Sequence, residues 1–190
     1  WSLPAQRWQG PGGPIVLCWR PTALLTDSGW AVLLQALDQV ATRLDRPVHW
    51  LPFHRQQDTG LLQELRERRL VPPGLEARSR DLQVENPQQA CEQFRGAALV
   101  VSMRLHGLIL AALAGAPCAA LSYDPKVKRA AEALACPCTD LEAGAMAVPQ
   151  AAALGQSWLS VAEVPPAPAT IDQLRQQTGV HAELLHHQLG

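Results

Sequence analysis

The sequence predicts an α/β domain in which helices cover both faces of a parallel sheet. Short runs that are almost wholly apolar, such as residues 15–19 and 97–102, are typical of parallel strands buried on both sides. Each run is followed by a segment whose apolar residues recur at intervals of three and four, the period of an amphipathic helix. The two patterns alternate five times between residues 15 and 135, and such alternation favours a parallel sheet.

Proline and helix-capping residues divide the first half of the chain. The predicted strand at residues 15–19 is followed by a helix that starts near residues 27–28, an Asp-Ser pair that suits a helix N-terminus. A second strand is predicted at residues 47–53. Either residue of the Asp-Thr pair at 58–59 would cap the next helix, which ends before the Pro-Pro-Gly run at 72–74.

The middle of the chain holds the strongest strand pattern. A weak strand at residues 82–84 precedes a helix over residues 86–95, whose proline suits a first helical turn. The run at 97–102 is the one expected to lie at the centre of the sheet. Apolar residues at helical spacing follow over 105–115, and the glycine at that segment's end suits a helix C-terminus.

Beyond residue 115 the pattern weakens toward the C-terminus. A Tyr-Asp-Pro turn separates a strand at residues 117–122 from a helix at 126–135. Residues 137–140 are predicted to form an edge strand. An alanine-rich stretch, a proline-rich linker at 165–168 and a final helix from about residue 170 complete the prediction.

Composition fits one globular domain. Of the 190 residues, 47% are hydrophobic and 17% are charged, which is enough for a single core. The 16 basic and 17 acidic residues nearly cancel, so we expect no nucleic-acid partner. No apolar stretch approaches the roughly 20 residues that cross a bilayer, so we expect no transmembrane segment. Residues 1–14 show neither helical nor strand periodicity and are interpreted as a linker from a longer chain.

The cysteines indicate a reducing, cytoplasmic setting. There are five of them, an odd number, and most lie in predicted strands and helices rather than in a loop framework. Cys136 and Cys138 lack the two-residue gap and the second pair that a structural zinc site usually has. We therefore expect no metal.

The segment from Ser102 to Gly107 places an arginine and a histidine where the central strand passes into its helix. In parallel sheets, ligands bind outside the carboxyl ends of the strands, so this turn lies at the expected ligand edge. The unpaired N–H groups of the helix, together with Arg104, could hold a phosphate, and His106 could donate a proton. Arg20 occupies the corresponding place after the first strand. Two guanidinium groups in one crevice would suit a ligand with a phosphate and a carboxylate.

Two adjoining motifs carry a family resemblance. They are Leu-Val-Val-Ser-Met-Arg-Leu-His-Gly-Leu-Ile-Leu-Ala-Ala-Leu-Ala-Gly-Ala-Pro at residues 99–117 and Ser-Tyr-Asp-Pro-Lys-Val-Lys at 122–128. Both resemble the polysaccharide pyruvyl transferase family, and the likeness to its bacterial cell-wall branch, called CsaB, is close. Trp-Arg-Pro at 19–21 and Leu-Pro-Phe-His-Arg-Gln-Gln-Asp at 51–58 also match. The resemblance covers residues 15–141, and the combination of Arg-Leu-His with Tyr-Asp-Pro-Lys is highly specific.

The resemblance implies a Rossmann-like fold similar to the C-terminal domain of a GT-B glycosyltransferase, in which the active site lies between two halves. Residues 15–164 would be the donor-binding domain and residues 1–14 the linker from a missing N-terminal half. Residues 165–190 would be a linker and a C-terminal helix. The implied reaction transfers pyruvate as a ketal from phosphoenolpyruvate to a sugar of a cell-wall or extracellular polysaccharide precursor. We expect the fragment alone to have little or no turnover.

The resemblance also implies residue roles and partners. Arg20, Arg104 and Leu105 would bind phosphoenolpyruvate, and His106 would be the proton donor. Phosphoenolpyruvate is a substrate, and no cofactor is expected. The acceptor would be a glycan or a lipid-linked sugar, in the cytoplasm or at the inner membrane surface.

Three further polar residues are candidates for acceptor binding or for support of the site. Asp58 and Asp124 could each orient a hydroxyl group, although both also suit helix N-capping. Lys126 opens a helix near the ligand edge, where it could assist anion binding or simply be solvated.

Two other functions use the same fold. One is a GT-B glycosyltransferase with a nucleotide-sugar donor, which would need a carboxylate or a stacking site for the nucleoside after the late strands. The other is a non-catalytic binding domain, against which the presence of Arg20, Arg104 and His106 argues. Titration with phosphoenolpyruvate and with nucleotide sugars would separate these classes.

Overall fold

The computed structural model describes residue 10 and residues 12–84, 87–141 and 150–163. Within these residues the strands form one six-stranded sheet in the order β3-β2-β1-β4-β5-β6, and every neighbouring pair is parallel. The strands are β1 (Ile15–Cys18), β2 (Val48–Trp50), β3 (Ser79–Asp81), β4 (Leu99–Ser102), β5 (Cys118–Ser122) and β6 (Cys138–Asp140). The helices are α1 (Asp27–Leu44), α2 (Arg55–Asp58), α3 (Leu61–Glu67), α4 (Pro73–Arg78), α5 (Pro87–Arg95), α6 (Leu105–Leu113), α7 (Pro125–Ala133) and α8 (Ala151–Glu163).

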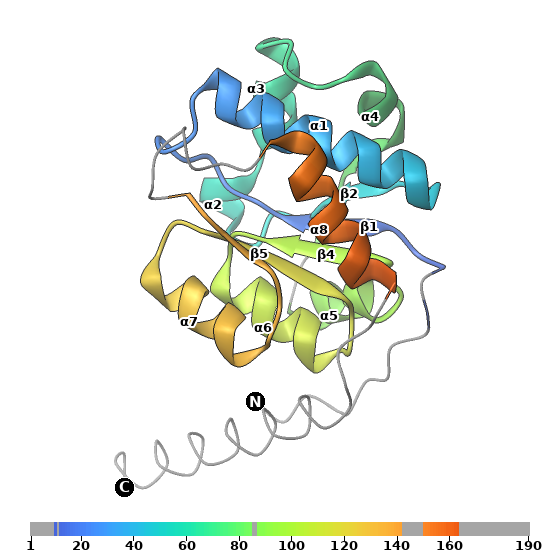
Figure 1. Ribbon diagram of the computed structural model, residues 1–190, viewed down its shortest axis with the longest axis vertical. Helices are drawn as coiled ribbons and strands as arrows, with labels where there is room; N and C mark the ends of the chain where they lie inside the picture. Colours follow the sequence, from blue (N-terminus) through green and yellow to red (C-terminus); the bar gives the residue numbers. More distant parts are fainter. Residues whose placement is uncertain (1–9, 11, 85–86, 142–149, 164–190) are drawn as a thin grey trace, which may run out of the picture.

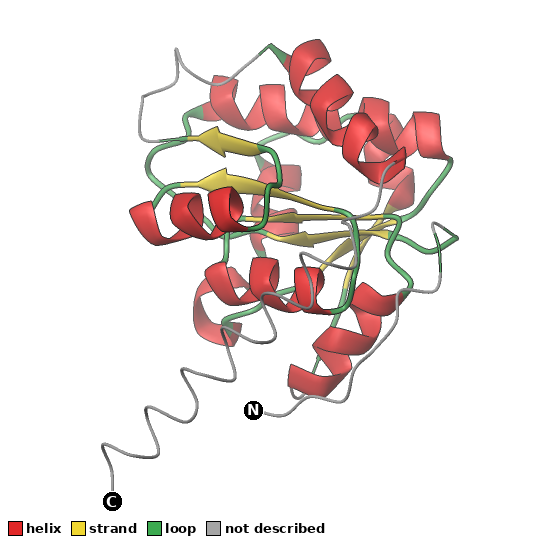
Figure 2. Ribbon diagram, turned by 60° about the horizontal axis from the view of Figure 1, so that its bottom comes forward, coloured by secondary structure: helices red, strands yellow, loops and turns green. Residues whose placement is uncertain are grey.

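Alternate residues of the central strands face two separate cores. Ile15 and Leu17 of β1 belong to a core that includes residues of α1, α3, α4 and α8, whereas Val16 and Cys18 belong to one with α5, α6 and α7. Figure 1 shows α1 and α8 on one face of the sheet and α5, α6 and α7 on the other. Figure 2 shows the same layered arrangement from a second direction. Because both faces are covered, every side chain of β1 is buried, which explains its unbroken apolar run.

The predicted fold class is confirmed, but several elements differ from the sequence prediction. The third strand lies at Ser79–Asp81 rather than at residues 82–84, and it is a polar edge strand that hydrophobic patterning cannot detect. Pro73 does not merely end the preceding helix, because it stands at the first position of α4. The alanine-rich stretch forms α8. The predicted linker at 165–168 and the final helix from about residue 170 lie outside the described residues.

A cluster of four tryptophans ties helices to the carboxyl end of β1. The ring centroid of Trp19 lies 5.5 Å from that of Trp50, 6.1 Å from that of Trp30 and 6.4 Å from that of Trp158. These partners come from β2, α1 and α8, and edge-on or tilted aromatic pairs of this kind add to the stability that burial alone provides. The loop that follows β1, including Arg20, therefore starts from a rigidly packed residue.

Close packing of α6 against the sheet requires glycine at position 107. A Cβ atom there would lie 2.8 Å from Oγ of Ser102 and 3.0 Å from both Cβ and Sγ of Cys18. Alanine favours a helix more than glycine does, but these neighbours are short side chains that cannot move aside. We expect Gly107→Ala to lower the free energy of unfolding by about 2 kcal/mol, measured by urea denaturation.

Gly96→Ala is the control for this prediction. A Cβ at residue 96 would meet no atom within 4 Å, and the residue does not have a positive φ. The free energy of unfolding of this variant should stay within about 0.5 kcal/mol of the native value. If Gly107→Ala were as stable as Gly96→Ala, the close contact of α6 with β1 and β4 would be wrong.

Candidate functional site

The loops after β1 and β4 meet at the point where the order of strands reverses. From β1 the chain proceeds outward to β2 and β3, and from β4 it proceeds the other way to β5 and β6. In open parallel sheets such a switch point creates a crevice at the carboxyl ends of the strands, where ligands bind. Cys18 pairs with Ser102 in the register of the two strands, and Arg20 and Arg104 each come two residues later. The structure thus brings together the two arginines that the sequence singled out.

Arg104 is held in place by Ser102 at the end of β4 and by two residues of α2. Its backbone N–H donates to Oγ of Ser102 at 3.1 Å, and the Ser102 hydroxyl donates to the Arg104 carbonyl at 2.7 Å. The guanidinium group donates from Nε to Oδ2 of Asp58 at 3.1 Å and from Nη2 to Oδ1 of the same carboxylate. Nη2 also donates to Oε1 of Gln57 at 2.9 Å. A two-point ion pair of this kind fixes both the position and the plane of the guanidinium.

Arg20 is held by a residue from a third strand. Its Nη1 donates to the Tyr123 hydroxyl at 3.3 Å, its Nε donates to the Pro21 carbonyl at 3.2 Å, and its guanidinium carbon lies 5.1 Å from the centre of the Tyr123 ring. This is a cation–π contact supported by a hydrogen bond. Tyr123 begins the turn after β5, so three consecutive strands contribute to the site. Sequence reasoning did not propose Tyr123 as a site residue, although its motif was among those that carried the resemblance.

The first turn of α6 supplies the remaining candidate residues. Arg104 occupies the N-cap position with extended backbone, and Leu105 and His106 are the first two helical residues. The backbone N–H groups of this turn have no partner within the helix and carry the positive end of its dipole. The His106 side chain is exposed, whereas Leu105 is half-buried and packs against the second core. The turn therefore places N–H donors next to Arg104, and the exposed His106 follows two residues later.

The two candidate aspartates play different parts. Asp124 is a helix cap, because its Oδ1 accepts from the N–H of Lys126 at 2.7 Å at the start of α7. Asp58 was predicted as an alternative cap for α3, but the N-cap of that helix is Gly60, without any side-chain hydrogen bond. Asp58 instead ends α2 and is buried, with Oδ2 also accepting from the backbone N–H of His54 at 2.8 Å. Lys126 is exposed at the ligand edge.

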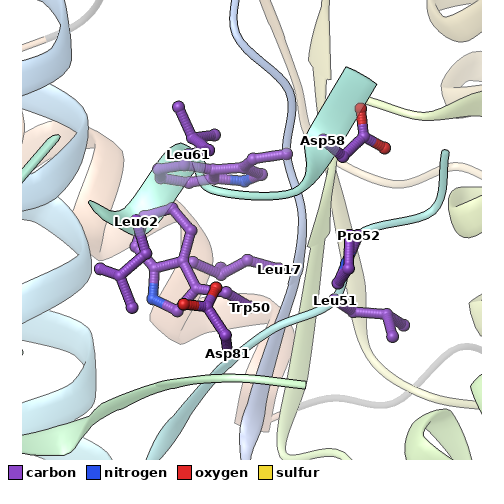
Figure 3. A pocket seen from close by; sticks show the side chains of 9 residues that line it. Leu17, Trp50, Leu51, Pro52, Asp58, Leu61, Leu62 and Asp81 are labelled. Carbon is purple, nitrogen blue, oxygen red and sulfur yellow. The ribbon is translucent and has the colours of Figure 1, made fainter. Parts of the chain in front are cut away.

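A small pocket at the carboxyl ends of β1 and β2 has Asp58 among its lining residues. Figure 3 shows Asp58 and Asp81 on different sides of this pocket, with Leu61 and Leu62 of α3 forming part of its wall. Trp19 also lines the pocket, but the residue is only 2% exposed. The ring therefore offers no open face on which a donor could stack.

The fold resembles solved glycosyltransferase domains. The chain matches an O-GlcNAc transferase mutant from Thermobaculum terrenum with a TM-score of 0.51 and 13% identity, over 89% of this chain and 32% of that chain. It also matches MurG from Acinetobacter baumannii with a TM-score of 0.42 and 12% identity, over 88% of this chain and 50% of that one. The chain thus spans 32% of the first of these proteins and 50% of the second. Its strand order and its match to the O-GlcNAc transferase show that the chain is a GT-B-like α/β domain. It carries two arginines at the switch point of the sheet.

Family membership follows from the sequence match. Residues 20–125, just over half of the chain, match the family described as polysaccharide pyruvyl transferase. The chain belongs to this transferase family, which confirms the resemblance. A search of curated proteins returned no match. In the part of the chain that the structure describes, no helix is both long and apolar enough to cross a bilayer.

Proposed function

We propose that this chain is the donor-binding half of an enzyme that transfers pyruvate from phosphoenolpyruvate to a sugar as a ketal. The observation that carries the proposal is the convergence of Arg20, Arg104 and the first turn of α6 on one switch-point crevice. Family membership supports a pyruvyl donor. A donor with both a phosphate and a carboxylate suits two separately held guanidinium groups together with backbone N–H donors.

Each arginine has one nitrogen left for the donor. Nη1 of Arg104 and Nη2 of Arg20 make no hydrogen bond to any residue that the structure describes. In our proposal these two nitrogens bind the anionic groups of phosphoenolpyruvate, and Leu105 contacts its carbon skeleton. Lys126 adds positive charge at the same edge of the sheet.

The proposed reaction begins with proton transfer from His106 to the vinyl CH₂ of the donor. This forms the methyl group and leaves an oxocarbenium-like carbon, to which a sugar hydroxyl adds with loss of its proton. Inorganic phosphate then leaves with the electrons of its C–O bond, and a second sugar hydroxyl closes the ketal with loss of its own proton. One hydroxyl proton restores His106 and the other is carried off by phosphate. The exposed position of His106 allows it to face a substrate held between two domains.

The acceptor in this proposal comes from the other half of the enzyme. The active site of such an enzyme lies between the two halves, so residues 15–164 would supply the donor and a domain linked through residues 1–14 would bind the glycan or lipid-linked sugar. Synthesis of a cell-wall or extracellular polysaccharide precursor would take place in the cytoplasm or at the inner membrane surface. All five cysteines are free thiols.

Titration calorimetry with phosphoenolpyruvate tests the donor assignment directly. Arg104→Ala removes a charged hydrogen-bond donor and should weaken binding about 30-fold, equivalent to about 2 kcal/mol. His106→Ala should bind nearly as well as the native chain, because His106 acts on the carbon atom and not on the anionic groups. A nucleotide sugar should show no comparable binding.

Arg78→Ala is the matched control. Arg78 at the end of α4 pairs with Asp45 at the end of α1, and both precede a strand, so this ion pair lies at the end of the sheet opposite to the donor site. The variant should leave donor affinity unchanged. Tight binding of a nucleotide sugar, or binding of phosphoenolpyruvate that is indifferent to Arg104, would overturn the proposal. If only the two-domain enzyme bound the donor, the second half would have to contribute to the donor site.

A further inference from the structure

We infer that Asp58 is a positioning residue that determines which edge of the Arg104 guanidinium is offered to the donor. This inference rests on the donor site proposed above and names a group that does not itself touch the substrate. The Asp58 side chain is fully buried, and that of Arg104 is 15% exposed. A buried carboxylate is strongly destabilising unless it is paired and hydrogen-bonded. Separation of Asp58 from Arg104 would therefore be energetically costly.

The geometry of the pair leaves Arg104 one direction for a ligand. Nε and Nη2 form one edge of the planar guanidinium, and both donate to the carboxylate of Asp58. The second hydrogen of Nη2 is taken by Gln57. Only Nη1 remains, so the donor meets Arg104 at one nitrogen instead of the two-point contact usual for arginine and phosphate. Asp58 thus fixes the orientation of the Arg104 guanidinium, and its negative charge at the same time weakens the attraction of Arg104 for an anionic donor.

Asp58 is itself fixed by its own backbone surroundings. Its Oδ2 accepts from the N–H of His54, which closes the single turn of α2 around the carboxylate. Burial raises the pKa of the nearby Cys18 thiol well above its usual range, so no thiolate competes with Asp58 for Arg104. The α2 turn therefore fixes the position of the Asp58 carboxylate, which in turn holds Arg104, 46 residues further along the chain.

Two effects of Asp58 on donor affinity have opposite signs, which makes the inference testable. If its negative charge mattered most, removing that charge would strengthen the binding of an anionic donor. If orientation matters most, the same change frees Arg104 to adopt other rotamers and weakens binding. Asp58→Asn separates the two, because it keeps the shape of the side chain but replaces one acceptor oxygen by an amide that cannot accept from Arg104.

The experiment combines donor affinity with the NMR signal of the Arg104 Nε–H group, assigned from its absence in Arg104→Lys. In the native chain this proton should exchange slowly with water, and in Asp58→Asn its signal should be lost to fast exchange. Phosphoenolpyruvate affinity should fall about tenfold in the same variant. In the two-domain enzyme, KM for phosphoenolpyruvate should rise by a similar factor, with kcat changed less than about twofold.

The chain offers a matched control in Asp45→Asn, which changes the partner of Arg78 at the opposite end of the sheet. Asp45 has a φ of 52°, a conformation that asparagine also tolerates, so this variant should fold and should alter neither readout.

Gln57→Ala is a milder variant that keeps the ion pair, and we expect a loss of donor affinity of about threefold.

Each result has a definite meaning. Unchanged or tighter donor binding by a folded Asp58→Asn chain would overturn the inference, as would a slowly exchanging Arg104 Nε–H signal in that variant. Failure of the donor assignment would look different, because neither the two-domain enzyme nor the isolated chain would then bind phosphoenolpyruvate. The exchange of Arg104 Nε–H would still report whether Asp58 holds that side chain.

Discussion

Replacement of His106 by alanine in the two-domain enzyme is expected to lower kcat by about 100-fold to 10,000-fold. In the proposed mechanism, protonation of the vinyl carbon converts an unreactive enol ester into a carbon that a hydroxyl can attack, so loss of the proton donor affects every later step. Donor affinity should change little, because His106 lies beyond the two arginines on the first turn of α6. Steady-state kinetics and calorimetry on the same variant give both quantities.

Solvent deuterium provides an independent check on the proton transfer. In D₂O, the ketal methyl of the product should carry one deuterium, detectable by mass spectrometry. A His106→Ala enzyme that kept its turnover would show that another group donates this proton. A product methyl without deuterium would exclude an exchangeable acid such as imidazole as the donor.

The sequence was sufficient for the fold because the buried parallel strands have a clear hydrophobic signal. Residues 97–102 are apolar almost throughout, and the strand found there has neighbours on both sides and helices on both faces. The edge strand β3 carries no such signal, since its Ser-Arg-Asp residues are partly or fully exposed. Helix α8 was missed for a related reason, because its alanines occupy both exposed and buried positions and so obscure the helical hydrophobic period.

The candidate site divides along similar lines. Arg20 and Arg104 were found because each follows a recognisable strand, and adjacency of strands then places them in the same crevice. Asp58 was a candidate for supporting the site, but its contact with Arg104 was not predicted, and neither was that of Tyr123 with Arg20, because these pairs are 46 and 103 residues apart in the chain. Local pattern offered Asp58, or its neighbour Thr59, as the cap of the next helix. A buried ion pair across the sheet is decided by tertiary packing, which a single sequence does not reveal.

Acid should destabilise the domain through His49, a buried residue of β2. Burial lowers the pKa of His49 to about 4, the charge of Arg80 acts in the same direction, and the interaction with Gln93 opposes it. Nε2 of the imidazole accepts from Nε of Arg80 at 2.7 Å, so the folded state requires the neutral ring. The unfolded chain, with a pKa near 6.5, binds a proton more readily.

The sign of the effect follows from this difference in proton binding. The contribution of His49 is fully present above pH 6.5 and is lost as the pH falls toward 4, because only the unfolded state takes up the proton in that window. The loss amounts to at most about 3 kcal/mol, a large part of the stability of a typical domain. Urea denaturation at several pH values between 4 and 7 measures it.

Two variants distinguish His49 from the carboxylates that also titrate toward pH 4. His49→Gln removes the titrating group and should make the free energy of unfolding nearly independent of pH between 6.5 and 5, whatever its effect at neutral pH. Arg80→Ala removes the neighbouring charge and the hydrogen bond to Nε2, so it should raise the pKa of His49 and flatten the profile in part. If native and His49→Gln proteins lost stability in parallel over this range, the acid sensitivity would have to come from carboxylates, and the neutral imidazole on β2 would not be a condition for folding.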